Sequence, residues 1–184
     1  STIAVNDGLP SLRINALVKT DGDVLLAGTD SGLFQLNGAR WIALGASKEL
    51  AGRRVLSLFA DSAGVLVGTS DGYLELGTDL VPLPIAQRFA GFQPLVLPHP
   101  VVLSVLRERG HLWLGTPGGL VHIMRSRGVP TLISIKERNG LGHDLVRCLH
   151  QDRSGGIWAG TGYGGVSKFT SDAFLYFTER DGLG

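Results

Sequence analysis

The residues Asp152-Arg-Ser-Gly-Gly-Ile-Trp-Ala-Gly-Thr-Gly-Tyr-Gly-Gly-Val166 join a polar turn, a short apolar run, a Gly-Thr pair and a glycine-rich turn. The Gly-Thr pair occurs four times in the 184 residues, and the other three copies are Gly28-Thr29, Gly68-Thr69 and Gly115-Thr116. The spacings between pairs are 40, 47 and 45 residues. Periods of this length are typical of β-propeller blades. An internal repeat therefore decides the fold.

Each Gly-Thr pair stands in the same local pattern. In the first copy an apolar run at Ile14 to Val18, a polar turn at 21–23 and a second apolar run at Val24 to Ala27 precede the pair. A glycine-containing turn and a third apolar run follow it, and most copies have a fourth. No stretch shows a helical period, so the pattern predicts four short antiparallel strands in each repeat. We expect an all-β fold of four four-stranded β-propeller blades.

The repeats place the blades at about 11–44, 53–84, 101–135 and 144–178. Prolines interrupt the fourth strand of the second blade, which fits an outer edge because proline donates no ladder hydrogen bond. Gly-Leu segments recur between blades, at 6–10, 139–142 and 181–184. Residues 1–5 precede the first such segment and are predicted to form the outer strand of an earlier blade. This arrangement predicts an open arc, or part of a larger ring of about seven blades.

Composition excludes several classes of protein. The chain is 43% hydrophobic and 18% charged, with a formal net charge of +1, so we expect a folded domain without nucleic-acid partners. Cys148 is the only cysteine, which excludes an intramolecular disulfide and a cysteine metal cluster. No run of about 18 apolar residues occurs, so we expect no membrane insertion by this segment.

Catalytic and cofactor motifs are not apparent. The five histidines lack metal-ligand spacing, and His122 and His150 are expected to pack on strands. The Gly160–Gly165 run resembles a phosphate loop only superficially, because a strand and not a helix follows it. We therefore predict no catalytic residues, no metal and no cofactor. Trp113 and Trp158 precede equivalent Gly-Thr pairs and are expected to pack between blades.

The run from the polar turn to the third strand resembles the two-component regulator propeller repeat. The fourth copy, 152–166, is the best match, and the third keeps Leu-Trp-Leu-Gly-Thr-Pro-Gly-Gly-Leu at 112–120. The first and second copies have Leu26 and Leu66 in place of tryptophan. The resemblance implies the sensory propeller of a bacterial signalling receptor, in the periplasm or otherwise outside the cytoplasm. It further implies that other blades and signalling modules of the same receptor are its partners.

On a propeller, the loops between the second and third strands and the loops between blades line one rim. We expect a ligand, a small molecule or a saccharide, to bind there. The amphipathic ring of Tyr163 suits stacking, and the Arg53-Arg54 pair suits an anionic group. The predicted ligand-binding residues are Tyr163, Arg53, Arg54, His143, Asn139, Asp30 and Asp71, and Arg13, Lys48 and Asp144 share the rim. The alternative is that these residues form a solvated rim that binds no specific ligand.

Two other functions remain open at this point. Unpaired blade edges, or the long segment 78–100, favour an interaction scaffold and a homo-oligomer. A propeller-type lyase or hydrolase requires several His, Glu or Asp side chains converging at one rim, and only His143 with Asp144 stand out. The resemblance favours the non-catalytic sensor.

Overall fold

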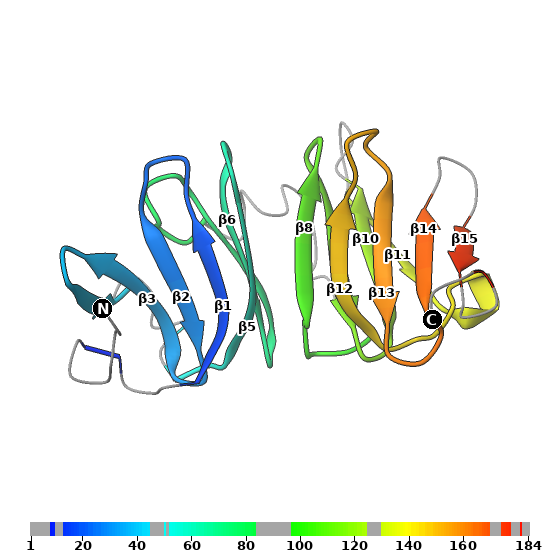
Figure 1. Ribbon diagram of the computed structural model, residues 1–184, viewed down its shortest axis with the longest axis horizontal. Coiled ribbons are helices and arrows are strands. Elements are labelled where there is room, and N and C mark those ends of the chain that lie inside the picture. The colour runs from blue at the N-terminus through cyan, green and yellow to red at the C-terminus, as the bar shows by residue number, and fades with distance from the viewer. Residues whose placement is uncertain are drawn as a thin grey trace. The chain divides into compact units, whose positions relative to one another are not determined.

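The computed structural model describes residues 8–9, 13–44, 50, 52–83, 97–124, 130–169, 174–177 and 181. The chain divides into two compact units, Ser1–Pro84 and Ile85–Gly184, each with two β-sheets. The sheets are antiparallel meanders, coloured from blue to red along the chain in Figure 1. The predicted all-β propeller fold is confirmed. The predicted strand at 1–5, Lys48 and most of the segment 78–100 lie outside the described residues.

The first unit contains blades 1 and 2. Blade 1 is a sheet of four strands in chain order, and blade 2 is a sheet of three. The strands are β1 (Ile14–Lys19), β2 (Leu25–Thr29), β3 (Gly32–Asn37), β4 (Arg40–Ala43), β5 (Val55–Asp61), β6 (Gly64–Thr69) and β7 (Gly72–Leu76). Among the described residues, blade 2 has the first three of its four predicted strands. An isolated bridge between Leu76 and Pro82 stands where a fourth strand was expected, because Pro82 lacks the N–H that would extend the ladder.

The second unit contains blades 3 and 4, both four-stranded and both ordered as consecutive neighbours. The strands are β8 (Ser104–Glu108), β9 (His111–Thr116), β10 (Gly119–Met124), β11 (Thr131–Ile135), β12 (Val146–Gln151), β13 (Ile157–Thr161), β14 (Val166–Phe169) and β15 (Phe174–Phe177). A short 3-10 helix, η2 (Glu137–Asn139), lies in the junction between these blades.

The first strands of blades 1, 2 and 4 carry a β-bulge that sequence patterning did not predict. In blade 1, Ile14 pairs with Thr29 and Ala16 pairs with Gly28, so Asn15 has no cross-strand partner. The same register shift occurs in blades 2 and 4. A bulge bends the strand and redirects the side chain of the extra residue. In blade 1 it directs Asn15 toward the next blade.

The glycine of the Gly-Thr pair is where adjacent blades come together. A Cβ atom at Gly28 would lie 2.5 Å from Cγ1 of Val55 at the start of blade 2. A Cβ atom at Gly115 would lie 2.8 Å from Cγ1 of Val146 at the start of blade 4. Both valines are fully buried. The predicted structural role of the glycine, a close approach between sheets, is thus seen in both units.

A leucine in the junction before blades 1, 2 and 4 packs in the core. Leu9, Leu50 and Leu141 are at most 5% exposed, and each lies five residues before the first residue of its blade. Leu50 packs in the cluster that joins blades 1 and 2, with Leu26, Val55 and other apolar side chains. The Gly-Leu segments predicted the first and third of these leucines. Leu50 has no Gly before it, and only the strand register aligns it with the others.

Candidate functional site

The rim turns are built by the threonine of each Gly-Thr pair. The Thr116 hydroxyl donates to the carbonyl of Gly119 at 2.7 Å and accepts from the N–H of Gly118 at 3.1 Å. Thr29, Thr69 and Thr161 make the same two kinds of contact. The repeated pair is structural, and it holds the variable residues that follow it at the rim.

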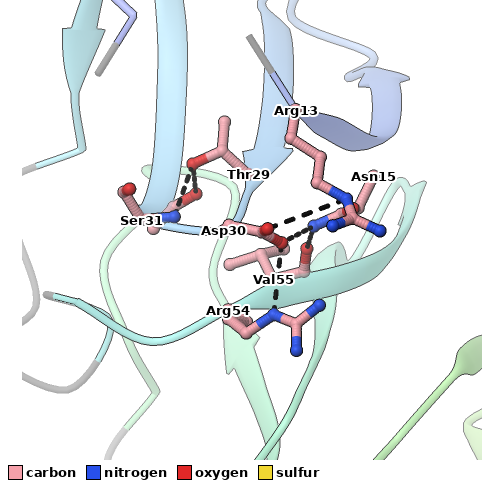
Figure 2. A network of polar contacts seen from close by, with 8 residues as sticks. Arg13, Asn15, Thr29, Asp30, Ser31, Arg54 and Val55 are labelled. Carbon is pink, nitrogen blue, oxygen red and sulfur yellow. Dashed lines mark hydrogen bonds and ion pairs between the residues drawn. The ribbon is translucent and has the colours of Figure 1, made fainter. Parts of the chain in front are cut away.

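In the first unit, Asp30 is the centre of a polar network on the rim (Figure 2). Its Oδ1 accepts from Nδ2 of Asn15 at 2.9 Å and lies 3.2 Å from Nε of Arg54. Nε of Arg13 lies 3.8 Å from Oδ2. Asn15 also donates to the carbonyl of Val55 at 2.9 Å. The bulge residue therefore links the Asp30 turn of blade 1 to the start of blade 2.

The network keeps Asp30 ionised. The hydrogen bond from Asn15, and then the hydrogen bond and positive charge of Arg54, lower the pKa of the Asp30 carboxyl below its usual value. Its side chain is only 27% exposed. Asp30 thus acts mainly as the anchor that orients two guanidinium groups at the rim.

The Arg53-Arg54 pair does not present two free cations. Nη1 of Arg53 lies 3.5 Å from Oδ2 of Asp71 and donates to the Asp71 carbonyl, while Arg54 faces Asp30. Both guanidinium groups remain partly exposed, so their outer N–H groups are accessible to a ligand. Four of the predicted site residues therefore lie together as two ion pairs. Arg53 pairs with Asp71, and Arg54 pairs with Asp30.

In the second unit, Tyr163 and His143 meet at the rim. Their ring centroids are 5.2 Å apart in an edge-on arrangement, and Tyr163 is 81% exposed. Nδ1 of His143 accepts the N–H of Leu145 at 3.0 Å, so the ring proton of the neutral form is on Nε2. His143 is held as the support of the tyrosine ring.

Asn139 and Asp144 stabilise the junction beside this pair. Oδ1 of Asn139 accepts the N–H of Lys136 at 3.1 Å. Asp144 and Glu137 each accept the backbone N–H of the other, at 2.8 and 3.2 Å. The oxygen of Asn139 is thus used within the fold, and its exposed amide nitrogen remains available.

His99 is a rim residue that sequence reasoning missed. It occupies the position in blade 3 that His143 occupies in blade 4, and its Nδ1 accepts the N–H of Val101 at 3.1 Å. It lies against the rim turn at Gly118. The shared spacing, His three residues before the Val that begins the blade core, is the signal that identifies it.

Asp152 holds the polar turn and the tryptophan of blade 4, at the opposite end of the strands. Its carboxylate accepts from Nε1 of Trp158 at 2.8 Å and lies 2.9 Å from Nζ of Lys168. Hydrogen bonds from Ser154, then Trp158 and Lys168, hold the pKa of Asp152 far below its usual value. The Asp-to-Trp spacing of the repeat therefore has a structural purpose.

The described cavities lie at this opposite end of the blades and not at the predicted rim. One, of about 410 Å³, lies between blades 3 and 4 and is lined by residues that include Glu108, Arg109, Ser154 and Lys168. Another, of about 130 Å³, lies between the equivalent turns of blades 1 and 2. Neither of these two cavities includes a predicted rim residue.

Within the described ranges, no group of three or more His, Cys, Asp or Glu side chains is placed to hold a metal ion. Among the same residues, no helix is long and apolar enough to cross a bilayer.

The fold and its repeat contacts define a set of β-propeller blades. A model of the family described as two component regulator propeller matches residues 140–163, from the junction before blade 4 to its rim turn. The chain thus carries a two-component regulator propeller repeat, which confirms the resemblance predicted from the sequence. No curated protein matches the chain.

Solved structures share the fold. The extracellular domain of the putative one component system BT4673 from B. thetaiotaomicron superposes with a TM-score of 0.70 at 21% identity, covering 88% of this chain. A second structure, described as the extracellular domain of the putative hybrid two component system BT4673, gives 0.67 at 21% identity and covers 90% of this chain. This chain spans 22% of the length of each. A Bacteroides caccae protein of unknown function gives 0.56 at 11% identity, with 90% and 59% of the two chains covered.

Proposed function

We propose that this chain is a non-catalytic, ligand-binding part of a sensory β-propeller that acts outside the cytoplasm in a bacterial signalling receptor. The observation that carries the proposal is the family match at residues 140–163, which covers the blade 4 rim turn. The BT4673 structures, which are extracellular domains of signalling systems, support it through the shared fold. The signalling modules of such a receptor are the proposed partners.

The rim is the proposed binding surface. In the second unit, the exposed ring of Tyr163 offers a flat apolar face with a hydroxyl at its edge. In the first unit, guanidinium and carboxylate groups alternate from Arg13 to Asp71. Rings of this kind stack on sugars, and paired charges exchange hydrogen bonds with hydroxyl groups. A saccharide or a similarly polar small molecule is therefore the proposed ligand class.

The test is a binding titration of the full chain with a neutral oligosaccharide, cellohexaose, and an acidic one, an oligogalacturonate. We expect heat or a shift in melting temperature with one probe, and a reduction of at least about tenfold in affinity in Tyr163→Ala or Arg53→Ala. Arg109→Ala, in the cavity at the other end of the blades, is the matched control. Loss of binding in that control alone would place the ligand in the cavity. Binding unaffected by both rim changes would refute the rim site.

A further inference from the structure

Two histidine rings lie close together where blade 3 packs on blade 4. The ring centroids of His111, on β9, and His122, on β10, are 5.4 Å apart. His122 is 9% exposed, and its ring stacks on that of Trp113 with centroids 3.7 Å apart. The ring centroid of Phe169, on blade 4, lies 6.1 Å from that of His122 and 4.8 Å from that of Trp113. The histidine pair therefore lies among aromatic side chains of both blades.

Each of the two histidines has a buried ring nitrogen without a partner. In the part of the chain that the structure describes, Nδ1 of His111 and Nε2 of His122 make no hydrogen bond. Buried polar atoms in proteins are almost always paired, and a neutral imidazole nitrogen is the commonest metal ligand. Two imidazoles that share one ion, at a metal–nitrogen distance of about 2 Å, have ring centroids about 5–6 Å apart. The observed separation fits this arrangement.

A thioether lies on the same face of blade 3. Pairing of β10 with β9 reaches Ile123 and Leu112, so the next two residues, Met124 and His111, stand opposite each other. Met124 also follows His122 by two residues, which places both on one face of the strand. It is the only methionine of the chain and is partly exposed. Strand register thus brings two imidazoles and one thioether together.

Blade 4 has a cation at the equivalent place. Strand pairing puts Lys168 opposite Trp158, just as His122 stands opposite Trp113. Nζ of Lys168 lies 4.8 Å from the ring centroid of Trp158, in a cation–π contact. The tryptophan of this repeat therefore accepts a positive charge from the neighbouring strand. In blade 3 the neighbour is an imidazole, so an ion bound to it would supply that charge.

The ligand types and the burial select the ion. Zn²⁺ is bound by sets of His, Cys, Asp and Glu, and no group of three such side chains among the described residues is placed to hold a metal. Imidazole suits copper, and a thioether selects its soft Cu(I) form. The cost of burying an ion rises with the square of its charge, which favours a monovalent ion here. We propose that His111, His122 and Met124 bind Cu(I) beside Trp113.

The cavity between blades 3 and 4 gives the ion a route to this site. Its volume is about 410 Å³, and its lining includes Glu108 and Phe169. Glu108 pairs with His111 across β8 and β9, and Phe169 lies beside His122. The carboxylate of Glu108 is 18% exposed and places a negative charge near the route. It attracts a cation and offsets part of the charge that the site takes up.

The test is a Cu(I) titration of the full, untagged chain without oxygen, in competition with the chelator bathocuproine disulfonate. Every chain carries Cys148→Ser, because the exposed thiol is itself a ligand for Cu(I). We expect a single Cu(I) ion to bind per chain. His111→Gln, His122→Gln and Met124→Leu are each expected to weaken binding at least about tenfold. His150→Gln, at an exposed histidine of blade 4, is the matched control and is expected to bind normally.

X-ray absorption at the copper edge identifies the ligands. Once Cys148 is replaced, Met124 carries the only sulfur atom of the chain. We expect the spectrum of the Cys148→Ser chain to show sulfur and imidazole scattering around copper. In Met124→Leu the sulfur contribution is expected to disappear while the imidazole contribution remains. This readout separates a ligand from a residue that only supports the fold.

Four results would overturn the proposal: no Cu(I) bound by the Cys148→Ser chain, unchanged affinity in any of the three ligand variants, a spectrum without sulfur, or tighter binding of Zn²⁺ than of Cu(I). Circular dichroism verifies that each variant is folded. His122→Asn replaces His122→Gln if the buried substitution fails this check, and the partly exposed His111 and Met124 report independently of it. Oligosaccharide binding at the rim is measured without copper, so either proposal can fail alone.

Discussion

At the scale of single residues, the repeat is held by side chains that look like site chemistry in the sequence. The hydroxyl of Thr116 closes a turn, Asp152 orients a tryptophan and His143 accepts a backbone N–H. From the sequence alone, each of these three side chains could be assigned a binding or catalytic role. The contacts show that the residues identifying the repeat are used within it, and the proposed recognition rests on neighbours such as Tyr163.

Removing the Thr116 hydroxyl tests this structural role. The side chain is fully buried, and Thr116→Val would leave the Gly118 N–H and the Gly119 carbonyl without their partner. We expect a loss of about 1–3 kcal/mol in the free energy of unfolding, measured by urea denaturation. Thr116→Ser retains the hydroxyl and is expected to lose less. Equal losses in the two variants would contradict the role given to the hydrogen bonds.

His122 makes a second prediction at this scale. Its ring stacks on Trp113 with centroids 3.7 Å apart, and burial, followed by the nearby His111, lowers its pKa from 6.5 to about 4. As the pH falls below 6.5, the unfolded histidine takes up a proton that the folded one refuses until about pH 4. The folded state therefore becomes less stable across this window, by up to about 3 kcal/mol.

His122→Gln places at this position the residue type that blade 1 has in the equivalent place, Gln35. We expect the variant to lose less stability than the wild type between pH 6.5 and 4, measured by urea denaturation at each pH. His150→Gln, at an exposed histidine, is the control. Parallel pH profiles for wild type and His122→Gln would show that this histidine does not contribute.

At the scale of elements, glycine at the end of the second strand sets the distance between sheets. A methyl group at Gly115 would lie 2.8 Å from Cγ1 and 3.1 Å from the carbonyl oxygen of Val146. Both distances are shorter than ordinary van der Waals contact. Blades 3 and 4 cannot keep their separation if this position carries a side chain.

Gly115→Ala is accordingly expected to destabilise the second unit by about 1–3 kcal/mol, through overpacking between the sheets. Gly22→Ala is the matched control, because a Cβ atom there has its nearest neighbour at 3.7 Å. Thermal denaturation followed by circular dichroism measures both. Equal melting temperatures for the two variants would mean that the sheets are not closely packed at Gly115.

The strands themselves were largely predictable, because alternating turns and apolar runs are local features of the chain. In the first copy, the predicted apolar runs at Ile14 to Val18 and Val24 to Ala27 overlap β1 and β2. Two features were not predicted. The bulge at the first strand depends on how that strand pairs. The isolated bridge between Leu76 and Pro82, which stands in place of a longer ladder in the described part of blade 2, depends on which backbone groups find partners.

At the scale of the whole molecule, the chain is a set of β-propeller blades. Blade 1 packs on blade 2, and blade 3 packs on blade 4. The chain spans 22% of the length of the BT4673 extracellular domains, with which it shares the fold. The rim and the cavities at the other end of the blades are then the competing places for a ligand.

The sequence by itself determined the repeat, its strands, its turns and the family it resembles, because strand patterning and turn chemistry act over a few residues. Only the tertiary structure decided that Arg54 faces Asp30, that Arg53 faces Asp71, and that Ile14 lies uncovered. These contacts join residues on different strands and different blades. Their partners are set by how one sheet packs on the next, which spacing along the chain does not encode.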